Sequence, residues 1–259
     1  MASLYGIPER DDRRDEGVHK RVPTVIKVSH LTVCYGELKA VEDLSLEVQR
    51  GEILSLVGPS GCGKTTVVKA ILGLIPYEGK IEIFTSRLGY CPQKDVLFDW
   101  MTAYENAVLP LVLRKELPPS NIKELFERFG LSGFEEKRPY QLSGGMRQRL
   151  SLLRAVLSGE ELLVLDEPFS SVDAYTRKKL QIWLSEIVHR MKSTVVLITH
   201  DVEEAVFLSD RILILSDRPA RILKEIRVPF PKPRTIKTFS DPRFSEIEEE
   251  VLETLMNQP

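Results

Sequence analysis

The chain has 259 residues, of which 42% are hydrophobic and 29% are charged. This apolar content is enough for a packed core and exceeds that of a disordered chain. Lysine and arginine total 36 against 38 aspartate and glutamate residues, so the net charge is only -2. A charge this close to neutral argues against bulk electrostatic binding to nucleic acid or to anionic lipid.

The compartment is indicated by what the chain lacks. The opening residues, MASLYGIPERDDRRDE, contain no apolar segment typical of a signal peptide and are too acidic for a transit peptide. No uncharged apolar stretch approaches the roughly 18 residues that a membrane-spanning helix needs. Cys34, Cys62 and Cys91 are odd in number and widely spaced, so they predict neither a disulfide framework nor a metal site. We therefore expect a soluble intracellular protein.

Residues 1–22 alternate charges without periodicity, and we interpret them as a flexible tail, with a solvated helical turn as the alternative. From Val25 onward, apolar runs alternate with helical stretches. The expected strands are 25–33, 44–48, 53–57, 162–165, 194–198 and 212–215. The expected helices are 65–72, 122–129, 146–157, 177–190 and 202–208. This alternation predicts a parallel α/β sheet with ligand sites at the carboxyl ends of its strands.

Three segments depart from this alternation. Residues 94–149 are mostly helical and proline-punctuated, so we expect a helical subdomain inserted in a core of residues 23–225. The segment KIEIFTSRLGYC, residues 80–91, is expected to form a tight hairpin. Residues 226–259 begin as a proline-rich linker and end in a short amphipathic helix that starts at Asp241 and Pro242.

The most specific motif is a glycine-rich loop that matches G-x-x-x-x-G-K-[ST] between an apolar strand and a helix. Its glycines allow successive amides to face phosphate oxygens, Lys64 can reach the β- and γ-phosphates, and Thr65 can ligate Mg²⁺. A glycine-rich turn without a ligand is the alternative, and Cys62 is either a small filler or a redox-sensitive thiol. The nucleotide-binding candidates are Gly58, Pro59, Ser60, Gly61, Cys62, Gly63, Lys64, Thr65 and Thr66.

A second motif, LLVLDEP, is an apolar strand that ends in two acids. Asp166 would lie at the carboxyl edge of the sheet, where it can bind Mg²⁺ directly or through water. Glu167 could then polarise an attacking water molecule. Acids at a strand end are often only turn or cap residues, but beside a phosphate loop they predict nucleotide hydrolysis.

The segment LSGGMRQR predicts a further helix, with Ser143 as its N-cap and Gly144 and Gly145 leaving its first amides accessible. Such a helix start can bind an anion, although it lacks a lysine of its own. An ordinary capped helix is the alternative interpretation.

Taken in order, these motifs resemble the ATP-binding subunits of ABC transporters, over about residues 24–225. The resemblance implies a P-loop NTPase (RecA-like) α/β core with a peripheral antiparallel β subdomain and an inserted α-helical subdomain. It implies that Tyr35 stacks on adenine, that Gln93 contacts the metal or the attacking water, and that His200 contacts the γ-phosphate. It also implies that Asp173 lies at a dimer interface, where Ser143, Gly144 and Gly145 of one copy close over ATP bound to the other.

The second half of the sequence, including DAYTR and THDVEEAVFLSDRILILSDRPARI, resembles the nitrate, sulfonate and taurine importers, with thiamine- and riboflavin-precursor importers as close relatives. The resemblance implies ATP and Mg²⁺ as cofactors. It implies a second copy and permease subunits as partners, a solute-binding protein indirectly, and a position at the cytoplasmic face of the membrane. The apolar residues 96–101 and Tyr104 either dock onto the permease or pack the helical subdomain.

Two other functions fit parts of the sequence. A soluble ABC ATPase acting on nucleic acid or ribosomes would share the motifs, but it usually has two nucleotide domains, a coiled coil or a strongly basic surface. A non-catalytic nucleotide-binding regulator would be expected to lack the base or the histidine, and this chain has both Glu167 and His200. We therefore expect a transport ATPase that does not bind nucleic acid.

Overall fold

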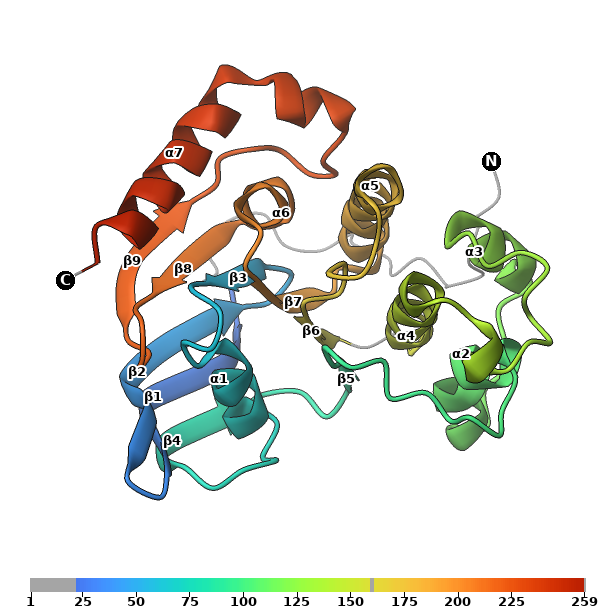
Figure 1. The fold of residues 1–259 in the computed structure, drawn as a ribbon, viewed down its shortest axis with the longest axis horizontal. Helices are drawn as coiled ribbons and strands as arrows, with labels where there is room; N and C mark the ends of the chain where they lie inside the picture. Colours follow the sequence, from blue (N-terminus) through green and yellow to red (C-terminus); the bar gives the residue numbers. More distant parts are fainter. Residues whose placement is uncertain (1–21, 159–160, 259) are drawn as a thin grey trace, which may run out of the picture.

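The computed structural model describes residues 22–158 and 161–258, so the tail predicted for residues 1–22 lies outside the described residues apart from Val22. The described chain forms two β-sheets with helices packed around them (Figure 1). Within these two ranges, no helix combines the length and the apolar character that crossing a bilayer requires.

The larger sheet has six strands and carries the nucleotide motifs. Its strands, in spatial order, are β5 (Leu88–Cys91), β6 (Leu162–Asp166), β7 (Thr194–Thr199), β3 (Ile53–Val57), β8 (Arg211–Leu215) and β9 (Ile222–Arg227). The strands from β5 to β8 are parallel, and β9 pairs antiparallel with β8. Every residue of β3, β6 and β7 is buried, which explains why these strands are apolar runs rather than alternating patterns. The predicted parallel α/β core is confirmed.

The smaller sheet is antiparallel and has three strands, in the order β2 (Leu38–Gln49), β1 (Thr24–Tyr35) and β4 (Glu78–Ile83). The hairpin predicted for residues 80–91 is wrong. Strand β4 pairs with β1, whereas β5 pairs with β6 of the large sheet. Ile81 and Ile83 pack on the apolar cluster beneath the small sheet, while Cys91 is fully buried on the other side of the large one. Strand β5 lies between both apolar clusters, since Leu88 and Tyr90 pack on the first and Cys91 on the second. Ile81 and Ile83 of β4 pack on the first cluster alone, so β4 belongs with the small sheet and β5 with the large one.

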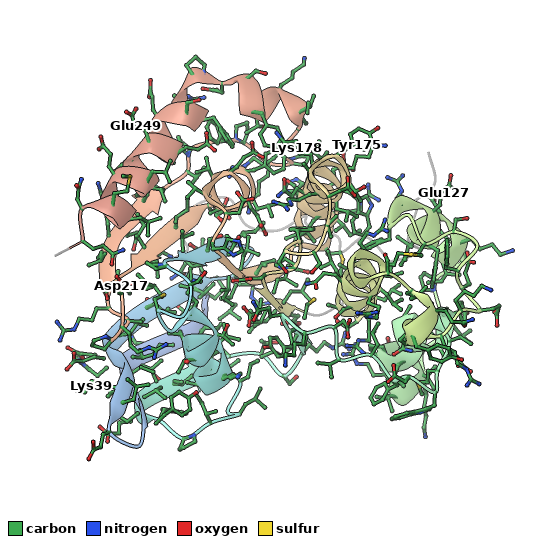
Figure 2. All side chains as sticks on the ribbon, in the orientation of Figure 1. Lys39, Glu127, Tyr175, Lys178, Asp217 and Glu249 are labelled. Carbon is green, nitrogen blue, oxygen red and sulfur yellow. The ribbon has the colours of Figure 1, made fainter. Side chains whose placement is uncertain are left out.

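The helices divide between the two faces of the large sheet. On one face, α1 (Lys64–Ile71) packs together with the small sheet against Leu54 and Leu56. The opposite face, which includes Ile53 and Val57, is covered by the remaining helices. They are α2 (Ala103–Leu113), α3 (Ile122–Arg128), α4 (Gly144–Leu157), α5 (Ala174–Met191), α6 (Val202–Leu208) and α7 (Pro242–Met256), with short 3-10 turns at η1 (Pro139–Gln141) and η2 (Ile236–Ser240). Side chains fill the space between these layers, and Glu249 lies on the outward side of α7 (Figure 2).

The predicted subdomain boundaries fall inside regular elements. Residues 94–149 contain α2, α3 and η1, but α4 continues to Leu157, and β9 crosses the boundary at residue 225. Helix α2 packs against α4, beside the β5 edge of the large sheet (Figure 1). The division into a tail, a core with a helical insert and a C-terminal segment stays a prediction.

The C-terminal segment after β9 packs back on the large sheet and on α6. Helix α7 contacts α6, β8 and β9, and Phe239 of η2 stacks on Phe207 of α6 with ring centroids 4.3 Å apart. Phe244 and Ile247 of α7 are buried in the same cluster. The segment is therefore part of the core packing.

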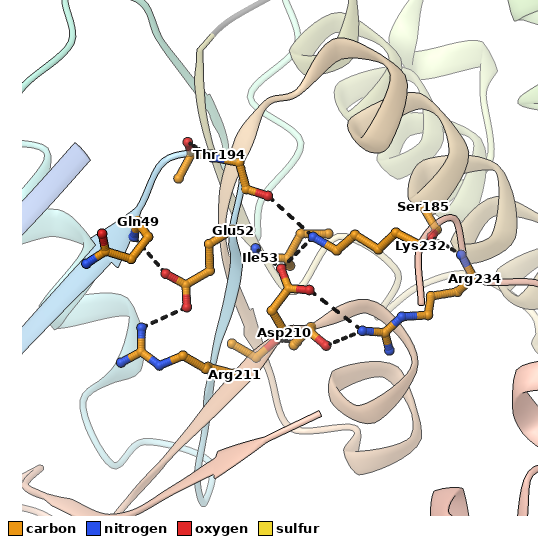
Figure 3. A network of polar contacts seen from close by, with 12 residues as sticks. Gln49, Glu52, Ile53, Ser185, Thr194, Asp210, Arg211, Lys232 and Arg234 are labelled. Atoms are coloured by element: carbon orange, nitrogen blue, oxygen red, sulfur yellow. Dashed lines mark hydrogen bonds and ion pairs between the residues drawn. The ribbon is translucent and has the colours of Figure 1, made fainter. Parts of the chain in front are cut away.

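Arg234 attaches this segment to the end of α6 (Figure 3). Its guanidinium is fully buried and donates to three carbonyl oxygens, those of Val206 (3.2 Å), Phe207 (3.3 Å) and Ser209 (2.8 Å). Its backbone amide donates to Ser185 Oγ of α5 at 2.8 Å. Burial lowers the pKa of Arg234 to about 10, so the side chain is still a cation at neutral pH. A cation at this position satisfies carbonyl groups that a helix C-terminus leaves without partners.

The same network continues to the amino ends of the central strands (Figure 3). Lys232 Nζ lies 2.5 Å from Asp210 Oδ2, which also accepts a hydrogen bond from the amide of Ile53 at 2.8 Å. Next to them, Arg211 pairs with Glu52 at 2.7 Å. These polar contacts fix the first residues of β3 and β8. They lie at the amino ends of the strands, whereas the phosphate loop lies at the carboxyl ends.

We predict that Arg234→Met lowers the free energy of unfolding by about 3 kcal/mol, because three buried carbonyl oxygens lose a charged donor. Arg227→Met, which removes an exposed arginine of β9, should change it by less than about 0.5 kcal/mol. Urea denaturation of both variants measures the difference. Equal stabilities would show that the Arg234 contacts contribute nothing to folding.

Candidate active site

The predicted site segments meet at one edge of the large sheet, because four neighbouring parallel strands end there in register. The phosphate loop follows β3, Asp166 ends β6 with Glu167 directly after it, His200 follows β7, and Gln93 lies two residues after β5. The aligned residues at this edge are Cys91 with Leu165, Asp166 with Ile198, and Val57 with Thr199. In α/β folds, ligands bind at such an edge.

The phosphate loop, residues 58–63, needs glycine at two left-handed positions. Gly61 has φ +79° and Gly63 has φ +128°. A Cβ atom at Gly63 would lie only 2.8 Å from the carbonyl oxygen of Ala40 in β2. Any side chain there would push the loop away from the small sheet, so the glycine fixes the shape of the turn. The result is a strand, a tight glycine turn and a helix start, which together form a cradle of amides for phosphate.

Lys64 lies across this turn and is almost fully buried. Its Nζ donates to the carbonyl oxygens of Gly58 (2.7 Å) and Pro59 (2.8 Å). The ammonium group is therefore held over the phosphate loop by the loop itself. Cys62 is also buried, and burial raises the pKa of its thiol, which disfavours the reactive thiolate and supports the role of a small filler.

Thr65 and Asp166 form a candidate magnesium site. Thr65 Oγ1 donates to Asp166 Oδ1 at 3.2 Å. Asp166 is only 1% exposed, and its Oδ2 is buried without a hydrogen-bond partner. Burial raises the pKa of Asp166. Hydroxyl and carboxylate oxygens are the ligands that Mg²⁺ prefers, and a buried carboxylate oxygen without a partner is suited to a cation.

Other oxygens must complete that coordination. The described residues contain no cluster of three or more His, Cys, Asp or Glu side chains that could hold a metal. Mg²⁺ commonly binds one or two protein oxygens together with substrate phosphates, and this pair lies beside the phosphate loop. The residues present therefore fit Mg²⁺ bound with a nucleotide, where the ion would neutralise phosphate charge.

Glu167 is at the centre of the hydrolytic group. Its Oε2 accepts a hydrogen bond from Gln93 Nε2 at 2.9 Å, and its Oε1 lies 3.2 Å from His200 Nδ1. The two residues come from the segments after β5 and β7, on either side of β6. Gln93 offers its amide nitrogen to Glu167, so its oxygen, the atom that could ligate Mg²⁺, is outside this bond. The structure thus brings together Glu167, Gln93 and His200, the three predicted catalytic residues.

The backbone of Glu167 is held in an unusual conformation. Its φ is +49°, a left-handed value that non-glycine residues rarely adopt. Its amide donates to the carbonyl oxygen of Ile198 at 2.8 Å, and its own carbonyl accepts a hydrogen bond from Gln148 Nε2 at 3.0 Å. These two bonds hold the left-handed backbone and thereby aim the carboxylate at Gln93 and His200.

The segment LSGGMRQR is not part of the same cluster. Ser143 is the N-cap of α4 and accepts a hydrogen bond from the amide of Met146 at 3.2 Å, as predicted. Ser143 and Gly144 are exposed. Helix α4 and the phosphate-loop helix α1 pack on opposite faces of the large sheet. Among the described residues, no hydrogen bond or ion pair joins Ser143, Gly144 or Gly145 to the phosphate loop.

Tyr35 and Asp173 are exposed. Tyr35 ends β1 and pairs with Leu38, two residues before the Ala40 carbonyl that meets the phosphate loop. Tyr35 is 48% exposed, so it can be reached by a ligand. Asp173 is the N-cap of α5, and the hydrogen bond from the Thr176 amide lowers its pKa. The roles in adenine stacking and in dimer contact stay predictions.

Two residues near the site were missed in the sequence. Gln148 is a buried residue of α4 whose side chain donates to the carbonyl oxygen of Glu167. Arg218 donates to the carbonyl oxygen of Gly61 at 2.5 Å. Gln148 carries a weak signal, because a buried polar residue on the face of a helix usually has a partner. Arg218 carries none, since a loop arginine between β8 and β9 looks like any solvated residue.

The site therefore has a phosphate cradle with its lysine, a hydroxyl and a carboxylate suited to Mg²⁺, and a carboxylate held between an amide and an imidazole. This set defines a P-loop nucleotide hydrolase.

Comparison with known proteins narrows this class. The model of the ABC transporter family matches residues 41–170. The chain is 40% identical over 246 residues to the aliphatic sulfonates import ATP-binding protein of Bacillus licheniformis, covering 90% of this chain and 96% of that protein. It is 36% identical over 252 residues to the taurine import ATP-binding protein of Escherichia coli, covering 90% and 98%.

Solved structures of ABC transporter cassettes resemble the chain in fold. The dimeric structure of a bacterial ABC transporter cassette superposes with a TM-score of 0.70 at 28% identity, over 80% of this chain and 100% of that chain. A dimeric post-hydrolysis cassette bound to ADP and Pi gives a TM-score of 0.69 at 26% identity, over the same shares. The chain belongs to the ATP-binding proteins of the ABC transporter family. It is an ATPase that uses ATP with Mg²⁺, as the sequence predicted.

We predict opposite effects of Asp166→Asn on stability and on metal use. Replacing a buried carboxylate, whose Oδ2 has no hydrogen-bond partner, by a neutral amide should raise the melting temperature of the metal-free chain. The same variant should lose the further stabilisation that Mg²⁺ adds to bound ATP, because a carboxylate ligand is gone. Thermal unfolding in EDTA, with ATP, and with ATP plus Mg²⁺ measures both effects. An undiminished Mg²⁺ effect would contradict the metal assignment.

We predict that Glu167→Gln retains binding of ATP and Mg²⁺ within about threefold but lowers phosphate release at least about 100-fold, because the amide cannot accept a proton from water. It should also accumulate as an ATP-bound dimer, which size-exclusion chromatography detects. Hydrolysis close to the wild-type rate would rule out Glu167 as the base.

Proposed function

We propose that the chain is the ATP-hydrolysing subunit of an ABC importer for small solutes of the sulfonate and taurine type. The observation that carries the proposal is the arrangement of Glu167, Gln93 and His200 beside the phosphate loop, in a chain whose relatives are named as import ATP-binding proteins. The nucleic-acid and ribosome alternative has no support in the comparisons.

The proposed site residues act in three groups. Residues 58–66 hold the phosphates, with Lys64 on the β- and γ-phosphates, while Tyr35 stacks on adenine. Thr65 and Asp166, with the amide oxygen of Gln93, hold Mg²⁺, which would neutralise charge on the phosphates. Glu167 accepts the proton of the attacking water, and His200 donates a hydrogen bond to the γ-phosphate.

The site is completed by a second copy. Ser143, Gly144 and Gly145 start a helix with exposed amides and lie on the opposite face of the sheet from the chain's own phosphate loop. Such a helix start favours an anion. In the proposed dimer, it closes over ATP bound by the partner, with Asp173 at the contact, and loss of the γ-phosphate releases the two copies.

The proposed contact with the permease lies in the segment after Gln93. Trp100 is 69% exposed, while Leu97 and Tyr104 pack on the helical core, so Trp100 is the candidate for the permease contact. Asn106 is buried, and its amide bonds to the backbone of residues 98, 101 and 102, which holds this loop in shape. A rigid loop with an exposed tryptophan can insert that side chain into an apolar pocket of a partner protein.

The same segment connects this surface to the site. Arg147 of α4 pairs with Asp95 at 2.8 Å, and Arg154 of α4 donates to the backbone carbonyls of Asp95 and Val96. Gln93, two residues earlier, contacts Glu167. A displacement of Gln93 during hydrolysis would therefore be passed to Trp100 and to the permease. Solute selection would be made by the permease and a solute-binding protein.

We predict that the tagged chain, purified from detergent-solubilised membranes of the source organism, brings a multi-span permease with it in comparable amount. Trp100→Glu should reduce this recovery at least about tenfold, because it puts a charge into an apolar contact. Leu252→Glu, which changes an exposed apolar residue of α7, should recover the permease normally. Mass spectrometry of the co-purified proteins reads out all three. Recovery of soluble proteins or nucleic acid alone would contradict the proposal.

The solute class has its own test. Deleting the gene should abolish growth on taurine or an alkanesulfonate as the sole sulfur source, and the wild-type gene should restore it while Glu167→Gln does not. Unchanged growth on these compounds, with the permease still recovered, would exclude sulfonates as the solute.

A further inference from the structure

A buried carboxyl group lies directly behind the hydrolytic site. Glu204 of α6 is 3% exposed, four residues after His200. Its Oε2 accepts a hydrogen bond from Thr199 Oγ1 at 3.0 Å, whereas its Oε1 is buried without a hydrogen-bond partner. An amphipathic surface helix seldom buries an acid in this way, and a buried polar group of this kind needs an explanation.

Glu204 binds the residues on both sides of His200. Thr199 Oγ1, which donates to Glu204, accepts a hydrogen bond from the amide of Asp201 at 3.0 Å. Asp201 Oδ1 in turn accepts a hydrogen bond from the amide of Glu204 at 3.1 Å. The three residues form a closed ring of hydrogen bonds, and the backbone of His200 lies between two of its members.

This ring extends to the segment that carries Asp173. Arg177 of α5 pairs with Asp201 Oδ2 at 2.9 Å and donates to the carbonyl oxygen of Val172 at 3.0 Å. The imidazole of His200 is about half exposed, so packing alone does not hold it. Besides the contact with Glu167 itself, the backbone on which His200 sits sets the direction of its side chain, and the ring of hydrogen bonds fixes that backbone.

We propose that Glu204 is a positioning residue whose buried carboxyl group, acting through Thr199 and Asp201, holds His200 in contact with Glu167. The inference rests on the proposed function, because it deepens the account of the same hydrolytic site. Glu204 itself contacts neither nucleotide nor metal in this scheme.

The protonation state of Glu204 makes the proposal sensitive to pH. Burial raises the pKa of Glu204 to about 8, with the carboxylates of Asp201 and Glu167 adding to the rise and Arg177 opposing it. On the outer side, Glu248 of α7 faces Asp201 and Glu203. At neutral pH the group is a neutral acid, and ionisation would add a buried negative charge near Glu167.

The sign of the pH effect follows. The folded-state pKa of about 8 lies above the ordinary value of 4.5, so the stability that Glu204 contributes is complete below about pH 4.5, falls as the pH rises from there, and is gone above about 8. In the folded protein the group ionises near pH 8, and hydrolysis by the wild type should fall as it does so. Glu204→Gln, which stays neutral and keeps an acceptor for Thr199, should remove that loss.

The test compares Glu204→Gln and Glu204→Ala in the full-length chain, with Glu203→Ala as a matched control on the same helix. We expect Glu204→Ala to lower kcat about tenfold with KM for MgATP within about threefold, because the γ-phosphate contact of His200 is lost mainly in the transition state. Glu204→Gln and Glu203→Ala should stay within about threefold of wild type at pH 7.

A second measurement does not depend on turnover. The chain has four histidines, so ring ¹³C signals can be resolved and His200 assigned with His200→Ala. Glu204→Ala should shift or broaden the His200 signal and leave that of His189 unchanged, whereas Glu204→Gln should leave both close to wild type. An unchanged His200 signal and unchanged kcat in Glu204→Ala would overturn the inference.

The two proposals fail in different ways. If wild type hydrolyses ATP and Glu167→Gln does not, while Glu204→Ala behaves as wild type, only the role of Glu204 is wrong. If Glu204→Ala lowers kcat with an unmoved His200 signal, the effect is general destabilisation, and the positioning role is again wrong. If the wild-type chain hydrolyses no ATP, the proposed function falls and the role of Glu204 falls with it.

Discussion

The register of four parallel strands is the constraint on which the site depends. Strands β5, β6, β7 and β3 end level with one another, so residues separated by up to 142 positions, from Gly58 to His200, follow their strands at a single edge. A shift of one strand by one residue would exchange its two faces. The pairing of Asp166 with Ile198 therefore sets the position of Glu167 relative to His200 as firmly as any side-chain contact does.

The two faces of the same sheet explain why the chain carries two helix starts suited to anions. Alternate residues of β3 face different apolar clusters, so Leu54 and Leu56 pack with α1, and Ile53 and Val57 pack with the other helices. The phosphate loop belongs to the first layer and α4 to the second. The phosphate loop and α4 cannot change layers without disrupting an apolar core. This supports a site in which one copy supplies the phosphate loop and the other copy supplies the start of α4.

Much of this arrangement could be predicted from the sequence, because the motifs have strict spacing and lie at strand ends. The chemistry of the phosphate loop and of the acids Asp166 and Glu167 follows from their places after apolar strands. The roles of Gln93 and His200 were expected from the family resemblance. The hairpin expected over residues 80–91 was wrong, because apolar alternation reports burial but not which sheet a strand joins. The burial of Glu204 could not be predicted from the sequence either. It depends on how α6 packs on β7 and α5, which no local pattern encodes.

The Arg234 contact has a consequence for the order in which the protein is made. The carbonyl groups at the end of α6 are synthesised well before the arginine that satisfies them. Until Arg234 leaves the ribosome, the carbonyl groups at the end of α6 have only water as a hydrogen-bond partner, and the apolar side of α6 lacks the cover of Phe239 and α7. The nucleotide motifs are then all present in the nascent chain, but the helix behind the histidine gains its full packing only once Arg234 and the helix after it have emerged. The packing of α6 behind His200 is therefore completed only after Arg234 has been synthesised.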